Sequence, residues 1–255
     1  MDIKDLFSID GKVTVVTGGS RGIGLMIARA FIDAGAKVYI SSRKADACAA
    51  TAEELGPSCV PVPADLSTVD GVRTLVAAIS EREERVDVLV NNAGATWGAP
   101  LEEFPEAGFD KVLDTNVKGV YYLTVGLLPL LRAAASDEDP ARVINIGSID
   151  GLRVPEMQNY AYSASKAAVH MLTRHLAHHL VEDRITVNAI APGLFPSKMT
   201  QFLFDHGEEN VAQFIPLKRV GRPEDIAGTA IYLASRAGSF LTGAVIPVDG
   251  GVATR

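Results

Sequence analysis

The stretch KVTVVTGGSRGIG, residues 12–24, decides the fold of this chain. A run of apolar, mostly β-branched residues ends at Thr17, and glycines and one arginine follow within a few positions. Because Val favours strands and glycine permits a tight turn, the stretch predicts a strand that passes into a helix through a glycine-rich loop. The free N–H groups and positive end of such a helix bind phosphate, so the loop is a candidate dinucleotide site.

Similar apolar runs recur along the chain and alternate with amphipathic segments such as 24–35, where Gly35 is a candidate C-cap. The runs lack polar alternation, which is typical of strands buried on both faces. This alternation predicts right-handed crossovers and a parallel sheet. We therefore expect an α/β fold, one Rossmann-type doubly wound domain over residues 1–255, with helices on both faces and about seven strands, at 13–17, 37–42, 59–64, 87–93, 142–148, 185–192 and 244–250.

Composition excludes several classes of protein. The 255 residues are 47% hydrophobic and 22% charged, with a net charge of −7, as in ordinary globular proteins. Nonspecific nucleic-acid binding needs a basic surface, so we expect no nucleic-acid partner. No apolar run is long enough to predict a membrane span. Cys48 and Cys59 show neither metal-ligand spacing nor a CxxC motif, which favours a reducing, cytoplasmic location.

The glycine pattern is T-G-x-x-x-G-x-G, and a lone glycine pattern is weak evidence. Further motifs follow it in order: NNAG (91–94), DTNVKG (114–119), INIGS (144–148), YSASK (162–166), NAIAPG (188–193), GRPEDIA (221–227) and VDGG (248–251). Together they resemble the short-chain dehydrogenase/reductase family over essentially the whole chain. The fold and activity of that family are therefore expected here.

The catalytic candidates lie in the middle motifs. Tyr162 and Lys166 are four residues apart, which puts them on one face of a helix, and a nearby ammonium lowers the pKa of a phenol from roughly 10. The pair is thus a candidate proton donor for a ketone. The resemblance adds Ser148, which would polarise the carbonyl oxygen, and Asn116, which would hold a water that links Lys166 to solvent. A buried Asn116 that stabilises a helix distortion is the alternative.

Histidines offer no convincing metal site. His175 and His179 are spaced so that both could bind one metal ion from one helix face, but no third ligand is evident and the HExxH pattern is absent. We expect no metal.

The second predicted strand indicates the cofactor. NAD-binding proteins usually hold the ribose 2′-hydroxyl with an acid at the end of this strand. Here Ser42 takes that place, Arg43 follows, and Arg21 lies in the glycine loop. Guanidinium groups bind a 2′-phosphate well, so we expect NADP(H) and reduction as the working direction. Solvated surface arginines are the alternative.

The resemblance implies cofactor contacts in several segments. Ser197 stands where the family often has threonine, and its hydroxyl can make the same bond to the nicotinamide amide. The stretch 194–216 would form an apolar lid over the substrate. The implied contacts are Gly18, Ser20, Arg21, Gly22, Ile23, Gly24, Ser42, Arg43, Asp65, Leu66, Asn92, Ala93, Gly94, Tyr162, Lys166, Pro192, Gly193, Phe195 and Ser197.

Details at 140–148, 159–168 and 191–200 resemble the β-ketoacyl reductases associated with rhamnolipid synthesis. This implies reduction of a 3-oxoacyl thioester, carried by acyl carrier protein or coenzyme A, by a homotetramer. Two alternatives stay open because fold does not fix substrate: a reductase of sugar, polyol, steroid or xenobiotic ketones, and a non-catalytic NADP-binding regulator. The intact candidate residues argue against the regulator.

Overall fold

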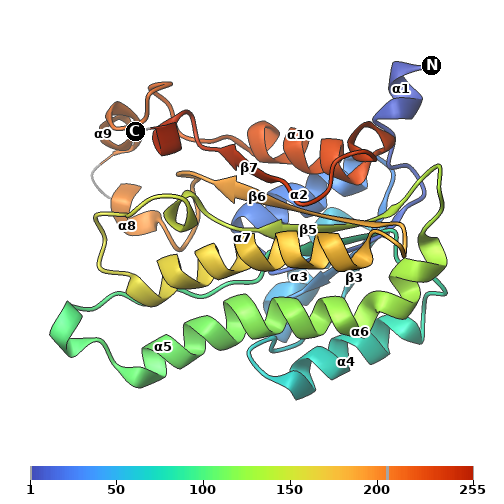
Figure 1. Ribbon diagram of the computed structural model, residues 1–255, viewed down its shortest axis with the longest axis horizontal. Coiled ribbons are helices and arrows are strands. Elements are labelled where there is room, and N and C mark those ends of the chain that lie inside the picture. Colours follow the sequence, from blue (N-terminus) through green and yellow to red (C-terminus); the bar gives the residue numbers. More distant parts are fainter. Residues whose placement is uncertain (1, 205–206, 255) are drawn as a thin grey trace.

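Seven strands form a single parallel sheet in the computed structural model, which describes residues 2–204 and 207–254 (Figure 1). Their order is β3-β2-β1-β4-β5-β6-β7, and every neighbouring pair is parallel. This confirms the predicted α/β class and doubly wound sheet. The strands are β1 Val13–Thr17, β2 Lys37–Ser41, β3 Cys59–Pro61, β4 Val88–Asn91, β5 Ala141–Ile146, β6 Ile185–Pro192 and β7 Val245–Val248.

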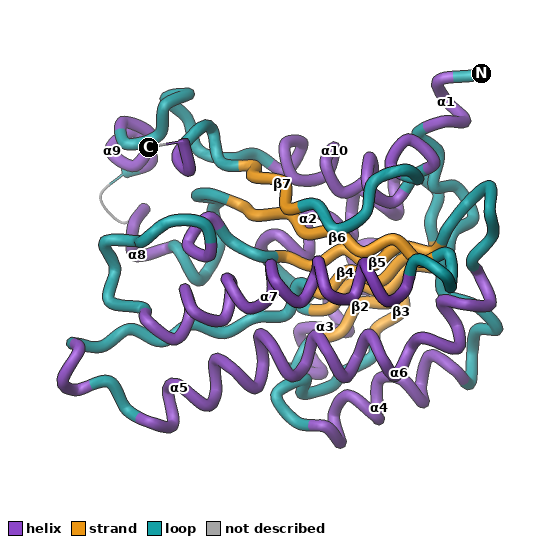
Figure 2. The backbone as a smooth tube through the Cα atoms, viewed as in Figure 1, coloured by secondary structure: helices purple, strands orange, loops and turns teal. Residues whose placement is uncertain are grey.

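Helices flank the sheet, as the purple segments of Figure 2 show. The helix predicted at 24–35 begins two residues earlier and ends at Asp33, and Gly35 follows with φ +88°. No helix among the described residues has the length and hydropathy needed to cross a membrane. The helices are α1 Ile3–Leu6, α2 Gly22–Asp33, α3 Ala45–Leu55, α4 Val69–Ser80, α5 Glu106–Leu113, α6 Gly119–Ala134, α7 Tyr160–Leu180, α8 Gln201–Phe204, α9 Glu208–Gln213 and α10 Pro223–Ala234.

Alternate strand residues fill two cores. Val16, Val88 and Val90 lie in a buried cluster with apolar residues of α2 and α10. Val15 and Leu89 lie in a second cluster with residues of α4, α6 and α7. Because successive side chains point to opposite faces, strands covered on both sides read as continuous apolar runs. This explains the missing polar alternation in the sequence.

The topology brings distant loops together. After β1 the chain moves outward to β2 and β3, and it then returns to β4 on the other side of β1. In such sheets the ligand binds at the carboxyl ends of the strands where the order reverses. The glycine loop after β1 and the NNAG segment after β4 are therefore neighbours at this edge of the sheet.

Three charged side chains form a network at the opposite, amino end of β1 and β5. Asp139 makes ion pairs with Lys12 at 2.6 Å and with Arg142 at 2.7 Å. Arg142 is 1% exposed and also donates a hydrogen bond to the Ser235 carbonyl. Burial raises the pKa of the Asp139 carboxyl, but the hydrogen bonds from Lys12 and Arg142 outweigh it, so the pKa is lowered overall. The network ties loop 135–140 to the sheet.

Candidate active site

The glycine loop turns where its glycines allow it. Gly18 and Gly22 have φ of +65° and +55°, a left-handed conformation that favours glycine. The Gly18 N–H donates to the Ser41 carbonyl at 2.7 Å, which ties the loop to the end of β2. At Gly24 a Cβ would lie 2.4 Å from both the Gly18 carbonyl oxygen and Asn92 Nδ2. Gly24 thus allows α2 to begin close behind the loop.

The NNAG segment supports the loop from the side. Thr17 Oγ1 accepts hydrogen bonds from the N–H groups of Asn92 and Ala93, both at 2.9 Å. Asn92 Nδ2 donates to the carbonyls of Thr17, at 2.8 Å, and Gly18, at 3.3 Å. The threonine of the glycine motif and the second asparagine of NNAG therefore hold the two loops in one arrangement.

A cavity of about 830 Å³ opens at this edge of the sheet. Eighteen of the nineteen residues expected at the cofactor line it, and Gly24, behind the loop, is the exception. Several lining residues were not expected from sequence because they come from other elements or follow a recognised motif. The lining residues missed include Ser41, Lys44, Ala47, Thr96, Lys111 and Thr115, whereas Lys198, Met199 and Thr200 belong to the expected lid.

One end of the cavity is positively charged. Arg21 at the start of α2, and Arg43 and Lys44 after β2, all line it, with Ser42 between the two loops. Arg21, Arg43 and Lys44 are exposed, and no acid stands at the end of β2. The arrangement suits a phosphate group, and the sequence pattern had signalled Arg21 and Arg43 but not Lys44.

Ser148, Tyr162 and Lys166 meet at the other end of the cavity. Ser148 follows β5, and α7 brings the other two side by side, with Lys166 Nζ 5.5 Å from the Tyr162 ring centroid. Lys166 is buried and donates a 2.8 Å hydrogen bond to the Ile146 carbonyl. Ser148 Oγ accepts the Asp150 N–H at 3.1 Å, which leaves its own proton free to donate.

The pKa of Tyr162 differs from the sequence-based expectation. We expected Lys166 to lower it, but burial raises the pKa of Tyr162 to about 12, against a lowering by the Ser148 side chain. Burial also lowers the pKa of Lys166 to about 8. The cost of placing a charge in this enclosed site thus dominates both pKa values, and Tyr162 holds its proton at neutral pH.

Asn116 lies beneath the cavity and does not line it. It sits in a π-helical segment, Asp114–Lys118, between α5 and α6. Its Oδ1 accepts the Ala95 N–H at 2.7 Å, and its Nδ2 donates to the Ala95 carbonyl and to Ser165 Oγ, both at 2.9 Å. Through these bonds the Asn116 amide joins the loop after β4 to α7. This agrees with the alternative given above, in which a buried asparagine stabilises a helix distortion. The water relay remains a prediction.

The expected lid comprises α8, α9 and the turns around them, and its residues 205–206 lie outside the described residues. At its base Phe195 is 2% exposed and packs its ring over Gly221. Ser197 bonds Thr200 through their hydroxyls at 2.9 Å. Ser197 faces the cavity as expected, and Thr200 is an additional hydroxyl beside it.

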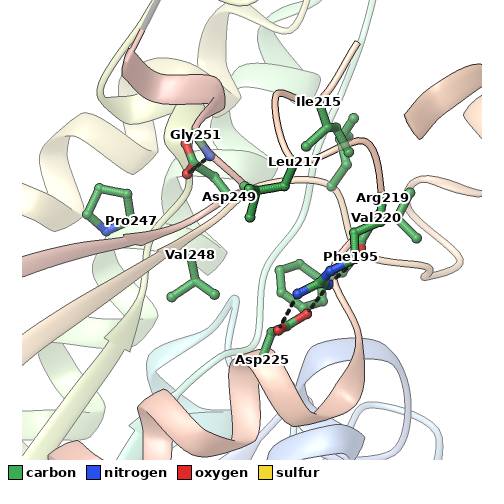
Figure 3. Close-up of a pocket in the computed structure, with 13 residues that line it drawn as sticks. Phe195, Ile215, Leu217, Arg219, Val220, Asp225, Pro247, Val248, Asp249 and Gly251 are labelled. Atoms are coloured by element: carbon green, nitrogen blue, oxygen red, sulfur yellow. Dashed lines mark hydrogen bonds and ion pairs between the residues drawn. The ribbon is translucent and has the colours of Figure 1, made fainter. Parts of the chain in front are cut away.

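A second, smaller cavity of about 320 Å³ shares Phe195 with the first and is shown in Figure 3. Its wall is mostly apolar, and its main charged group is a two-bond pair in which Arg219 donates to Asp225 at 2.5 and 2.8 Å. That pairing lowers the pKa of Asp225 to about 2. Asp249, another charged residue on the wall, accepts the N–H groups of Gly251 at 2.9 Å and Ala253 at 2.6 Å. Because these charged side chains already have partners, this cavity offers little chemistry.

Histidines 175 and 179 stack edge to face on α7, with ring centroids 5.0 Å apart. Across residues 2–204 and 207–254, no group of three or more His, Cys, Asp or Glu side chains is placed to hold a metal ion.

Known proteins resemble the chain over nearly its full length. A family model described as enoyl-(acyl carrier protein) reductase matches residues 18–253. The rhamnolipids biosynthesis 3-oxoacyl-[acyl-carrier-protein] reductase of Pseudomonas aeruginosa is 51% identical, covering 96% of this chain and 97% of that protein. The galactitol 2-dehydrogenase (L-tagatose-forming) of Cereibacter sphaeroides is 36% identical, with 98% of each chain covered. The structure of the Pseudomonas aeruginosa RhlG/NADP active-site complex matches with a TM-score of 0.94 and 50% identity, covering 98% of this chain and 99% of that one.

The sequence motifs of the expected family come together in the structure. The glycine loop, the NNAG support and the cluster of Ser148, Tyr162 and Lys166 surround one cavity. The family model and the relatives match this same arrangement from the glycine loop to the carboxyl-terminal motifs. The chain belongs to the short-chain dehydrogenase/reductase family.

Proposed function

We propose that the chain is an NADP-dependent ketoreductase that reduces a 3-oxoacyl thioester to the 3-hydroxyacyl form. The observation that carries the proposal is one cavity with a phosphate-binding end and a proton-donating end. Arg21 and Arg43 line the first, and Ser148, Tyr162 and Lys166 line the second. Both halves are supported by the Pseudomonas aeruginosa relatives, a 3-oxoacyl-[acyl-carrier-protein] reductase and a structure in complex with NADP.

The residues present fit NADP(H). The left-handed glycines bring backbone N–H groups to the cavity wall at the start of α2, where a diphosphate would bind. Arg21 and Arg43 would hold the 2′-phosphate, with Lys44 and the Ser42 hydroxyl beside them, and Ser42 stands where an acid at the end of β2 would repel it. When bound, the reduced nicotinamide supplies a hydride to the carbonyl carbon.

Tyr162 is suited to supply the proton. Because its pKa lies well above neutrality, the hydroxyl is protonated and can donate to the carbonyl oxygen as negative charge develops there. The free Ser148 hydroxyl proton donates to the same oxygen and polarises the carbonyl. Lys166, with a pKa of about 8, is protonated at neutral pH and stabilises the tyrosinate that remains.

Exposed apolar side chains support an acyl substrate. The segment between Ser148 and Tyr162 carries Val154, which is 89% exposed, and Leu152 and Met157 are exposed beside it. The lid adds exposed apolar side chains at Met199, Phe202 and Phe214. An acyl chain that lies along these segments would cover apolar surface that otherwise faces water.

The surface also supports the assembly and location expected from the sequence. Exposed apolar side chains on α6 and α7, Tyr121, Tyr122, Val125 and Met171, form the kind of surface that buries against other subunits, as a homotetramer requires. Cys48 and Cys59 are free and buried, in keeping with a reducing cytoplasm.

The test is turnover with matched substrates. The purified protein is mixed with NADPH, and loss of the nicotinamide absorbance is followed with a short and a long 3-oxoacyl thioester. Galactitol with NADP is assayed in parallel. We expect faster reduction of the long thioester and no galactitol oxidation. Galactitol oxidation without thioester reduction would replace the proposal, and NADPH binding with no turnover of either would favour the regulator.

A further inference from the structure

His170 is a buried histidine that the proposed reaction does not use. It lies on α7 one turn after Lys166 and is 4% exposed. Its ring fills space that two glycines leave on the segment carrying Ser148. A Cβ on Gly147 would lie 2.1 Å from His170 Nε2, and a Cβ on Gly151 would lie 2.9 Å from its Cε1. The imidazole is thus packed against the backbone on both sides of Ser148.

The ring also bonds Ser148 directly. The Ser148 N–H donates to His170 Nε2 at 3.5 Å, a long contact, and Nδ1 is buried without a hydrogen-bond partner. An imidazole that accepts at Nε2 is neutral and carries its proton on Nδ1. Burial, followed by the nearby charges of Lys166 and Arg174, lowers the pKa of His170 to about 4, against a raising by a hydrogen bond with the Gly151 backbone. With its pKa this far below neutrality, the ring is uncharged at neutral pH and can accept a hydrogen bond at Nε2.

Ser148 needs such support because it lies outside the regular secondary structure. It stands between the end of β5 and the 3-10 turn Ile149–Gly151, with extended backbone at φ −168° and ψ 154°. Its hydroxyl must keep both its bond from the Asp150 N–H and its direction toward the cavity. A displacement of about 1 Å at a catalytic group can lower the rate about 100-fold.

We propose that His170 is a positioning residue, which fixes the Ser148 hydroxyl by bonding and packing against the Gly147–Gly151 backbone. The inference rests on the proposed ketone reduction, in which Ser148 polarises the carbonyl. His170 touches neither the substrate nor the cofactor cavity, and its effect on turnover passes through Ser148.

Two substitutions separate the hydrogen bond from packing. His170→Leu fills similar space without an acceptor, whereas His170→Gln keeps an amide oxygen near the Nε2 position. We expect His170→Leu to lower kcat at least about tenfold and leave the Kd for NADPH unchanged, with much of kcat restored in His170→Gln. His175→Leu, an exposed residue of the same helix, is the matched control. If the leucine variant does not fold, His170→Asn replaces it, since the shorter amide cannot reach Ser148.

A double-mutant cycle tests the route through Ser148. In a Ser148→Ala background, we expect His170→Leu to cause little further loss of kcat, because the hydroxyl that His170 positions is gone. The same fold-loss in both backgrounds, or a folded leucine variant with unchanged kcat, overturns the proposal.

A second measurement does not depend on the substrate. Amide hydrogen exchange of the peptide that contains residues 147–151 should be faster in His170→Leu than in His175→Leu or the unaltered protein. Unchanged protection overturns the positioning role, whether or not the thioester assay succeeds. Failure of the unaltered protein to reduce any ketone, with the exchange result as expected, would instead overturn the proposed function alone.

Discussion

Removing the two arginines at the phosphate end of the cavity should weaken NADPH binding far more than NADH binding. NADPH and NADH differ only in the 2′-phosphate, so this group alone senses Arg21 and Arg43 if the cavity is oriented as proposed. The double variant Arg21→Ala, Arg43→Ala therefore tests cofactor recognition without touching the catalytic end.

The structure sets the size of the effect. A hydrogen bond to a charged group contributes about 1.5–3 kcal/mol. Because both side chains are exposed, solvent screening places each at the lower end, about 1.5 kcal/mol. Together they amount to about 3 kcal/mol, which corresponds to a roughly 150-fold rise in the Kd for NADPH. Lys44, which remains, limits the loss.

Titration calorimetry with each cofactor measures both constants. Arg73→Ala is the matched control, since Arg73 is exposed on α4, pairs with Asp70 and lies outside the cavity. We expect a change in the Kd for NADH of less than about tenfold, and a smaller NADPH effect at high salt because exposed charges are screened. Equal losses for both cofactors would refute the reasoning and leave the arginines as surface charges.

Three further changes test other parts of the account. Ser148→Ala should lower kcat about 100-fold or more with NADPH binding retained, because it removes a donor to the carbonyl oxygen, and an unchanged kcat would contradict that role. Gly24→Ala should destabilise the fold by about 1–3 kcal/mol and weaken NADPH binding, since its Cβ would collide with Gly18 and Asn92; Gly228→Ala on α10, where a Cβ meets nothing within 4 Å, is the control in thermal unfolding. Asp139→Asn should cost about 2 kcal/mol, less than for a fully buried pair because Asp139 is 37% exposed. The pKa of Asp139 is lowered in the folded state, so this contribution is present above the unfolded pKa and is lost as the pH falls through the folded value; a variant whose stability follows the same pH dependence as the unaltered protein would contradict the assignment.

The apolar runs and the loop motifs of the sequence predicted the sheet and most of the residues that line the cavity. Strand positions could be read from the sequence because burial on both faces demands apolar residues throughout. The loops after β1 and β4 could be placed together because parallel strands end at one edge. The strand ends could not be placed as well: β3 ends at Pro61 rather than at 64, and β4 ends at Asn91 rather than at 93. Pairing with the neighbouring strand, which the local sequence does not show, decides where a strand stops.

What the sequence could not predict depends on tertiary surroundings. Arg142 sits inside β5 and is almost fully buried, and its partners make this tolerable: Asp139, three residues before it, and the Ser235 carbonyl, far along the chain. The direction of the Tyr162 pKa was wrong, because spacing shows the nearby lysine but not the enclosure that opposes ionisation. His170 gave no signal, since its contacts are with glycines on another segment.

The proposed reduction depends on Tyr162 donating the proton in a cavity that binds NADPH. The most direct measurement is kcat and the Kd for NADPH in Tyr162→Phe, which keeps the ring and removes only the hydroxyl. The account predicts that kcat for the 3-oxoacyl thioester falls about 100- to 10,000-fold while NADPH binds nearly as before. A variant that keeps most of its turnover would contradict the claim.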